Sequence, residues 1–296
     1  ILVGFGRTGS QTGKHAGMHV GTIDSSGTSI TWGPAKHFSN NSSGNASNND
    51  IAYPYAIFAG SKVVYIADWF SASGVDTHSV VGTVDYSTDT ITADTDNTDA
   101  GVEQAPVECE GERKCIIYDT QNEKIVWFRK TATNSGNIEA YVGTITGTSI
   151  SWGTAVVAVN SGIVDTPFIK AVYDTNLSKC MLFYTEQTGN PSSSPANLFV
   201  TIGTVSGTTI TFDTPIQLTS NANAIWTANW VDAAFNSSTG QTVISIEDDI
   251  AQSVNTEMHG IVFTSISKLT STNYVGIANA NYNSGSSATV ITDGAV

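Results

Sequence analysis

Hydrophobic and polar residues alternate in short runs along the whole chain, and the runs recur in a fixed order. The stretch 165–218 shows this order most clearly, with runs at 166–174, 179–186, 197–205 and 208–212 that we name segments A, B, C and D. Alternation with a period of two is typical of a β-strand with one packed face, and no run has the period of a helix. Each repeat therefore predicts four strands and no helix.

A Gly-Thr pair in segment C marks the repeat most regularly. It begins at Gly21, Gly82, Gly143 and Gly203, with a degraded copy at Gly260, so the intervals are 61, 61, 60 and 57 residues. A steady period over a whole chain, with four strands in each repeat, is typical of a β-propeller. The sequence therefore predicts an all-β protein, a β-propeller with blades of four antiparallel strands.

The repeats divide the chain into five blades. They span about 1–38, 51–93, 105–159, 165–218 and 224–268, followed by a closing segment at 269–296, and we expect one propeller domain over 1–296. The first repeat lacks segment A and would leave an unpaired edge. We predict that residues 274–282 pair with residues 1–6, so that a composite blade made of both ends closes the ring. Six blades are the alternative, because the closing segment also contains a run of B type.

The C–D hairpins carry turn and packing signals of their own. Gly147 and Gly207 stand where a two-residue hairpin requires a positive φ. Trp32 and Trp152 occupy the position of Phe212 in segment D, so we expect them to pack between blades.

Composition and charge exclude some partners. The chain has 12 basic and 26 acidic residues and a net charge of -14, which repels a phosphate backbone, so we expect no nucleic-acid partner. No apolar run approaches the roughly 18 residues that span a bilayer, so we expect no membrane insertion. Since Ile1 begins inside a strand-like run, we expect further residues upstream.

Cysteines and acidic residues give two candidate sites in the loops. Cys109 and Cys115 bracket a short insertion in segment A of the third repeat and are candidates for a disulfide, whereas Cys180 lies alone in an apolar B segment. Asp94, Asp96 and Asp99 form a cluster of oxygen donors that suits Ca²⁺, although the glycine and distal Glu of an EF-hand loop are absent. A solvated loop is the alternative, and we expect no other cofactor.

The stretch Val-Gly-Thr-Ile-Thr-Gly-Thr-Ser-Ile-Ser-Trp-Gly-Thr-Ala-Val-Val (142–157) and its counterpart at 202–216 carry a family resemblance. They resemble the repeats of large tail-fibre or host-attachment proteins of marine bacteriophages, which have the form GTVSGTSISFGTPVVF. The segments 268–278 and 288–291 are similar to the way such arrays end, although those arrays usually continue into a further module. The resemblance implies a role in a virion tail or another extracellular assembly, with a homo-oligomer, by analogy a trimer. It assigns no binding residue.

Carboxylates are the candidate catalytic groups, because five-bladed propellers also house glycosidases. Hydrolysis of a glycoside requires two or three carboxylates that converge on one site. Asp68, Glu186 and Asp248 lie near the ends of B segments, and Glu108 and Asp232 lie in A segments. Because the three B-segment acids occupy related positions in the repeat, we interpret them as residues repeated with the blade, and we assign no catalytic residue.

Aromatic residues give the candidate ligand-binding site, since aromatic rings stack on sugars without catalytic geometry. Trp69 and Phe70 stand where the second repeat's B segment enters a loop, and Trp226 and Trp230 lie in an innermost segment. Core packing is the alternative for all four. We favour a non-catalytic attachment or receptor-binding propeller that recognises a host-surface glycan or protein through its loops. The alternative is a secreted lectin or glycoside hydrolase.

Overall fold

The computed structural model describes a large part of the chain: residues 1–6, 13–41, 50–71, 74–93, 103–104, 114–131, 137–160, 169–187, 195–219, 225–226, 231–249, 256–264, 277–278 and 290–291. These residues form strands and turns, and none of them lies in a helix. Within these ranges there is accordingly no helix with the length and apolar character needed to cross a membrane.

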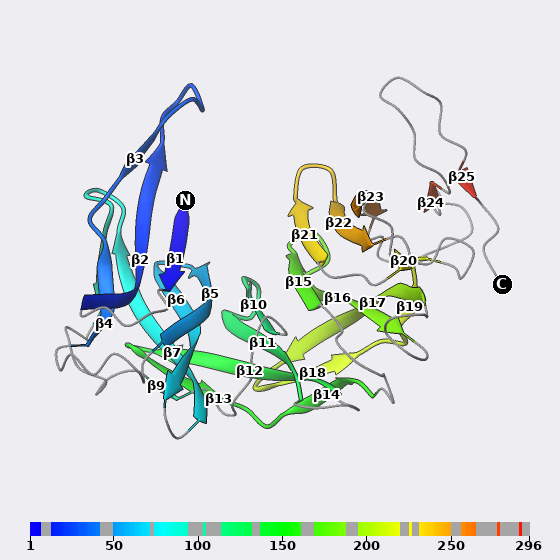
Figure 1. The fold of residues 1–296 in the computed structure, drawn as a ribbon, viewed down its shortest axis with the longest axis horizontal. Helices are drawn as coiled ribbons and strands as arrows, with labels where there is room; N and C mark the ends of the chain where they lie inside the picture. Colours follow the sequence, from blue (N-terminus) through cyan, green and yellow to red (C-terminus); the bar gives the residue numbers. More distant parts are fainter. Residues whose placement is uncertain are drawn as a thin grey trace. The chain divides into compact units, whose positions relative to one another are not determined.

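Five antiparallel sheets follow one another along the chain (Figure 1). Blade 1 contains β1 (Leu2–Gly6), β2 (Gly13–Ile23), β3 (Ile30–Trp32) and β4 (Lys36–Asn41). Blade 2 contains β5 (Asp50–Ala59), β6 (Lys62–Ser71), β7 (Gly74–Asp85), β8 (Thr90–Ala93) and β9 (Glu103–Gln104). Blade 3 contains β10 (Lys114–Asp119), β11 (Lys124–Lys130), β12 (Ile138–Thr146), β13 (Ser149–Trp152) and β14 (Val156–Val159).

The last two blades and a short final sheet complete the described strands. Blade 4 contains β15 (Ile169–Asp174), β16 (Lys179–Gln187), β17 (Pro195–Ser206), β18 (Thr209–Phe212) and β19 (Ile216–Gln217), and β20 (Ile225–Trp226) also pairs with β17. Blade 5 contains β21 (Val231–Asn236), β22 (Gln241–Asp249) and β23 (Thr256–Thr264). The final sheet joins β24 (Ile277–Ala278) to β25 (Val290–Ile291).

The prediction of an all-β fold with five antiparallel propeller blades is confirmed. Strand order in blades 2 to 4 follows A, B, C and D, and the first sheet begins with a B strand as expected. Segment D is two short strands rather than one run in blades 1 to 4. The C strands of these blades, β2, β7, β12 and β17, each pair with two such strands. In blade 1 the break falls at Gly33-Pro34, since proline has no N–H for the ladder.

The chain divides into two compact units. The first consists of 1–132, 140–155 and 207–209, and the second of 133–139, 156–206 and 210–296. The prediction that all 296 residues form one domain stays a prediction. The composite blade also stays one, because β1 pairs with β2, β24 pairs with β25, and most of 274–282 lies outside the described residues.

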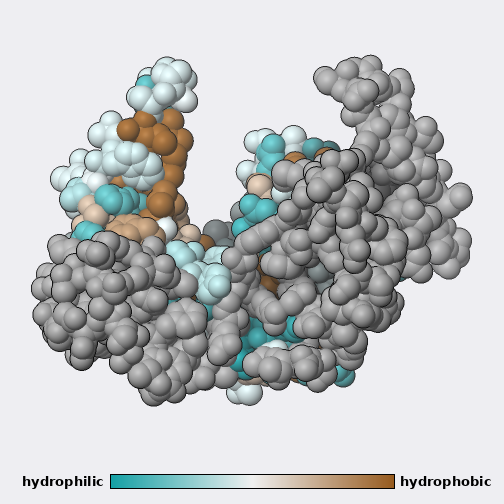
Figure 2. Space-filling view, viewed as in Figure 1, coloured by the Kyte–Doolittle hydropathy of each residue, from teal (hydrophilic) through white to brown (hydrophobic). Residues whose placement is uncertain are grey.

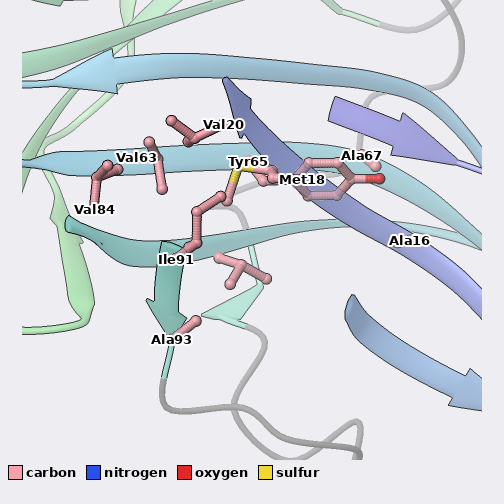
Figure 3. Close-up of a cluster of buried hydrophobic side chains, with 10 residues drawn as sticks. Ala16, Met18, Val20, Val63, Tyr65, Ala67, Val84, Ile91 and Ala93 are labelled. Carbon is pink, nitrogen blue, oxygen red and sulfur yellow. The ribbon is translucent and has the colours of Figure 1, made fainter. Parts of the chain in front are cut away.

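The B strands of blades 2 to 4, β6, β11 and β16, are buried on both faces. In the first unit, Val63 and Tyr65 of β6 face Met18 and Val20 of blade 1, as Figure 3 shows, and the Tyr65 hydroxyl donates to the carbonyl oxygen of Phe5 at 3.0 Å. Alternate residues of the same strand, Val64 and Ile66, pack instead with Ile116, Trp127 and Ile150 of blade 3. In the second unit, the equivalent core joins blades 4 and 5. It contains Val172, Met181, Phe183, Leu198, Val200, Leu218, Val231, Ile244 and Ile246.

The Gly-Thr marker has a structural cause in two contacts. A Cβ on Gly143 would lie 2.8 Å from both Ile150 Cγ2 and Trp152 Cζ3, and a Cβ on Gly203 would meet Ile210 and Phe212 equally closely. Glycine therefore lets the large side chains of segment D lie on the C strand.

The threonine of the marker accepts a hydrogen bond from the first residue of the B strand. Lysine Nζ and threonine Oγ1 are 2.7 Å apart in blade 2, 2.9 Å apart in blade 3 and 2.6 Å apart in blade 4. The residues are Lys62 with Thr83, Lys124 with Thr144 and Lys179 with Thr204. The most repeated positions of the sequence thus hold blades 2 to 4 together.

The A–B turns repeat a second device. The carboxylates of Asp119 and Asp174 each accept two backbone N–H groups of the following turn at 2.8–3.0 Å, which is an Asx-type turn. Each turn ends in a residue of positive φ, Glu123 at 53° or Ser178 at 55°. The positive φ predicted for Gly147 and Gly207 in the C–D turns is confirmed at 64° and 61°.

Blade 1 carries an exposed apolar face, seen as the brown surface along the β2–β3 hairpin in Figure 2. Ile23, Ile30 and Trp32 are 49%, 41% and 44% exposed. Their counterparts in blade 3 pack against the core shared with blade 2, which contains Trp152. The predicted packing of Trp152 is therefore confirmed, whereas that of Trp32 stays a prediction.

Replacing Gly143 with alanine tests the reason for the marker. The added Cβ would overlap Ile150 and the ring of Trp152, and overpacking of this kind costs about 1–3 kcal/mol of unfolding free energy. Denaturant unfolding of Gly143→Ala and of the control Gly260→Ala measures this, since a Cβ on Gly260 meets nothing within 4 Å. Equal stability of the two variants would contradict the explanation.

Candidate functional site

One position of the B strand differs between blades in a way that marks blade 2. Counted from the lysine that begins each B strand, the same position holds Asp68 in blade 2, Lys130 in blade 3 and Thr185 in blade 4. All three side chains are buried. A buried carboxylate is costly unless it is paired and hydrogen-bonded, so its partners decide what this position does.

Asp68 lies in a buried polar cluster between blades 2 and 3. Its Oδ2 is 2.5 Å from Nζ of Lys114, the first residue of β10, and both side chains are 0% exposed. Its Oδ1 accepts a hydrogen bond from Thr77 Oγ1 at 2.9 Å. In the second unit, the residue that begins the A strand of blade 5 is Val231 instead of a lysine. The ion pair is therefore an addition to the repeat.

Tyr53 contributes backbone strain beside this pair. It has a φ of 54°, which bulky residues rarely adopt, and it lies where the β5–β6 ladder is interrupted between Ala52 and Tyr55. Its ring centroid is 5.5 Å from Lys114 Nζ, a distance suited to a cation–π contact. A strained residue costs about 1–3 kcal/mol and is most often found at functional sites.

Trp69 and Phe70 follow Asp68 directly. We expected them where the strand enters a loop, but they lie inside β6, which continues to Ser71 and pairs with β5 and β7 on either side. The β6–β7 hairpin is therefore longer than the hydrophobic pattern indicated. Its strands stay paired as far as Ser71 and Gly74. The buried pair at Asp68 anchors the strand that carries both aromatic residues. Their binding role stays a prediction.

The second predicted aromatic pair is placed differently. Trp226 lies in β20 and pairs with Pro195 of the C strand β17, so it does not lie in an innermost strand as we expected. The A strand of blade 5 begins only at Val231, and Trp230 lies outside the described residues. A binding role for these two residues also stays a prediction.

The predicted metal and disulfide sites lie largely outside the described residues. Asp94, Asp96, Asp99 and Cys109 belong to segments that are not described. Cys115 is buried in β10, and the disulfide stays a prediction. Across the described ranges, no three His, Cys, Asp or Glu side chains come together in a way that could hold a metal ion.

The acids considered for catalysis divide between two faces. Asp68 stands six residues after the leading Lys62, and Glu186 stands seven after Lys179, so alternation places them on opposite faces of their sheets. The related repeat positions that we predicted for these two acids therefore face opposite sides of their sheets. Glu108 lies outside the described residues, as does the side chain of Asp248.

Two acids of the second unit are at least partly exposed to solvent. Asp232 of the A strand β21 is 71% exposed and lies 2.6 Å from Nζ of Lys170 in β15. Glu186 is half-buried beside Tyr184, whose pKa is raised by burial and further by the charge of Glu186. The remaining acids of the turns are held by local hydrogen bonds, which lower the pKa of Asp24 and of Asp85.

Sequence reasoning missed Lys114 and Tyr53. A signal for Lys114 was present, because it stands at the head of an A strand where blades 4 and 5 have Ile169 and Val231. No signal marked Tyr53, whose conformation depends on the bulge in β5.

No family model matches this chain, and no curated protein matches it. Three solved structures are similar to it. The catalytic domain of Coprinopsis cinerea GH62 alpha-L-arabinofuranosidase is 13% identical, with 89% of this chain and 72% of that chain covered and a TM-score of 0.42. An exo-1,5-alpha-L-arabinanase from a bovine ruminal metagenomic library is 9% identical, with 88% of each chain covered and a TM-score of 0.42. A thermostable family-43 glycoside hydrolase is 10% identical, with 89% and 91% covered and a TM-score of 0.39. Values this low identify no activity for this chain.

Removing one member of the buried pair should destabilise the protein strongly. Lys114→Met leaves the carboxylate of Asp68 buried beside an apolar side chain, and such a change costs about 3–5 kcal/mol of unfolding free energy. The double variant Asp68→Leu/Lys114→Met should be more stable than Lys114→Met, because no charge is left without its partner. Chemical denaturation measures both. A single variant as stable as the wild type would show that the pair is not buried as described.

Proposed function

We propose that this chain is a non-catalytic attachment module that recognises a host-surface glycan or protein at the B–C end of blade 2. One observation carries the proposal. The single blade end in the described part that combines a buried ion pair with a strained backbone leads directly into two aromatic residues, Trp69 and Phe70. Places where a sequence departs from its own repeat are where function is expected.

Asp68 is fixed by Lys114 and Thr77, so the backbone of the next two residues starts from a defined position. Recognition that relies on stacking gains from such positioning, because less freedom is lost on binding. Aromatic rings offer an apolar face to a sugar ring or to an apolar side chain of a protein.

The repeated positions support the same assignment because each of them already has a structural role. The marker residues pack segment D on segment C, and the turn aspartates bind backbone N–H groups. These positions are scaffold, so a ligand is expected to meet the positions that vary, at the blade ends and in the loops. A place in a phage tail fibre or similar extracellular assembly, and a homo-oligomer such as a trimer, are part of the proposal and rest on the resemblance of the repeats to tail-fibre proteins.

A glycan array and a panel of host cells test the binding site. The wild-type chain should bind, and the double variant Trp69→Ala/Phe70→Ala should lose at least about fivefold in affinity, since stacking contributes about 0.5–1.5 kcal/mol for each aromatic pair. The matched control is Tyr86→Ala, which removes an aromatic residue that is 57% exposed at the opposite end of the same blade. Unchanged binding by the double variant would remove these residues from the proposal.

A glycoside hydrolase is the second candidate, and the exposed Asp232 favours it. This carboxylate lies on the A strand of blade 5 beside a lysine, whereas Asp119 and Asp174 at the ends of other A strands are held by turns. Hydrolysis would require a second carboxylate at a suitable distance, for which Glu186 of the same unit is the candidate.

Release of product from a panel of aryl glycosides and polysaccharides distinguishes the two functions. The attachment proposal predicts no turnover by the wild-type chain. Turnover that falls at least about a hundredfold in Asp232→Asn or Glu186→Gln would establish the second candidate instead, since general acid–base catalysis contributes about that much.

A further inference from the structure

The contact between Lys114 and Asp68 is suited to a covalent step. Nζ of Lys114 lies 2.5 Å from Oδ2 of Asp68, the two residues belong to neighbouring blades, and they are 46 positions apart in the sequence. Neither side chain is exposed to any degree. We propose that this pair condenses to an intramolecular amide, an isopeptide cross-link between β6 and β10.

Burial supplies the reactive forms of both groups. The step requires transfer of one proton within the pair, from ammonium to carboxylate, and burial favours this transfer because charged groups are disfavoured away from water. The amine then has the lone pair that a nucleophile requires. The proton count of the pair is unchanged by this transfer.

The condensation balances without any further reactant. The Lys114 Nζ lone pair attacks Cγ of Asp68 and forms a C–N bond. The bond from Cγ to one carboxyl oxygen breaks, and that oxygen leaves as water with the acid proton and one proton of the amine. The products are a secondary amide and one water molecule, and nothing is oxidised or reduced.

The neighbours of the pair fit the requirements of this step. Thr77 Oγ1 donates to Oδ1 of Asp68 at 2.9 Å, so it stabilises the negative charge that develops on that oxygen during the attack. The Tyr53 ring lies beside the amine, with its centroid 5.5 Å from Nζ. The fixed approach of the two groups replaces the encounter that makes the same reaction slow in solution.

The ion pair of Lys170 and Asp232 can be compared with the buried pair. Their Nζ and Oδ1 atoms are 2.6 Å apart, almost the same distance as in the first pair, but the side chains are 32% and 71% exposed. Contact with water favours the charged form of an amine, and a charged ammonium has no lone pair for attack. The proposal therefore assigns a cross-link to the buried pair and none to the exposed pair.

Mass spectrometry of the purified full chain tests the proposal. The wild type should weigh less than its sequence mass by one water, and tandem spectra of a protease digest should contain one branched peptide that joins Lys114 to Asp68. Lys170 and Asp232 should appear in separate unmodified peptides. Thr77→Val should lower the cross-linked fraction at early times after synthesis, because it removes the hydrogen bond to Oδ1.

Lys114→Arg is the control, since it keeps a cation at this position and should have its full sequence mass. If that variant does not fold, the wild-type spectrum still decides. A folded wild-type chain at its unmodified mass, or a loss of water that maps to other residues, would overturn the proposal.

Discussion

The close approach of segment D to a glycine of the C strand is the contact on which the blades depend. A glycine has no Cβ, so isoleucine and tryptophan or phenylalanine side chains lie where any other residue would exclude them. The neighbouring threonine accepts a hydrogen bond from the lysine across the B–C ladder and fixes the register of the same strands. One dipeptide therefore joins three of the four strands of a blade, which explains why it is the most regular mark in the sequence.

This division of labour separates scaffold from function. Asp119 and Asp174 close turns, the lysines that begin the B strands hold threonines, and the alternating apolar residues fill the spaces between blades. Blade 2 departs from the pattern at Asp68, where a charge stands in the apolar face of a B strand and requires Lys114 as its partner. Because a buried pair of this kind adds little stability over an apolar pair, stability alone does not account for it.

The repeat made most of the blade structure predictable. Alternation and the Gly-Thr interval gave the five sheets, the order of their strands and the turns at Gly147 and Gly207, because each follows from contacts within one repeat. The site was less predictable. The Lys114–Asp68 contact joins two repeats, so comparison of one repeat with another does not indicate it. Asp68 and Glu186 both look like acids at the end of a B strand, but they stand one position apart in the repeat and therefore lie on opposite faces. The predicted position of Trp226 was wrong because β20 pairs with β17 of blade 4 and does not begin blade 5.

The structure depends on B strands that are buried on both faces in blades 2 to 4, and we place function at the ends of the blades. Native-state hydrogen exchange tests this dependence most directly, since the slowest amides report the most stable part of a structure. The account predicts that amides of β6, β11 and β16 exchange most slowly, and that those of the A–B and C–D turns exchange fastest among the described residues. Exchange of the B strands at the rate of the turns would contradict it.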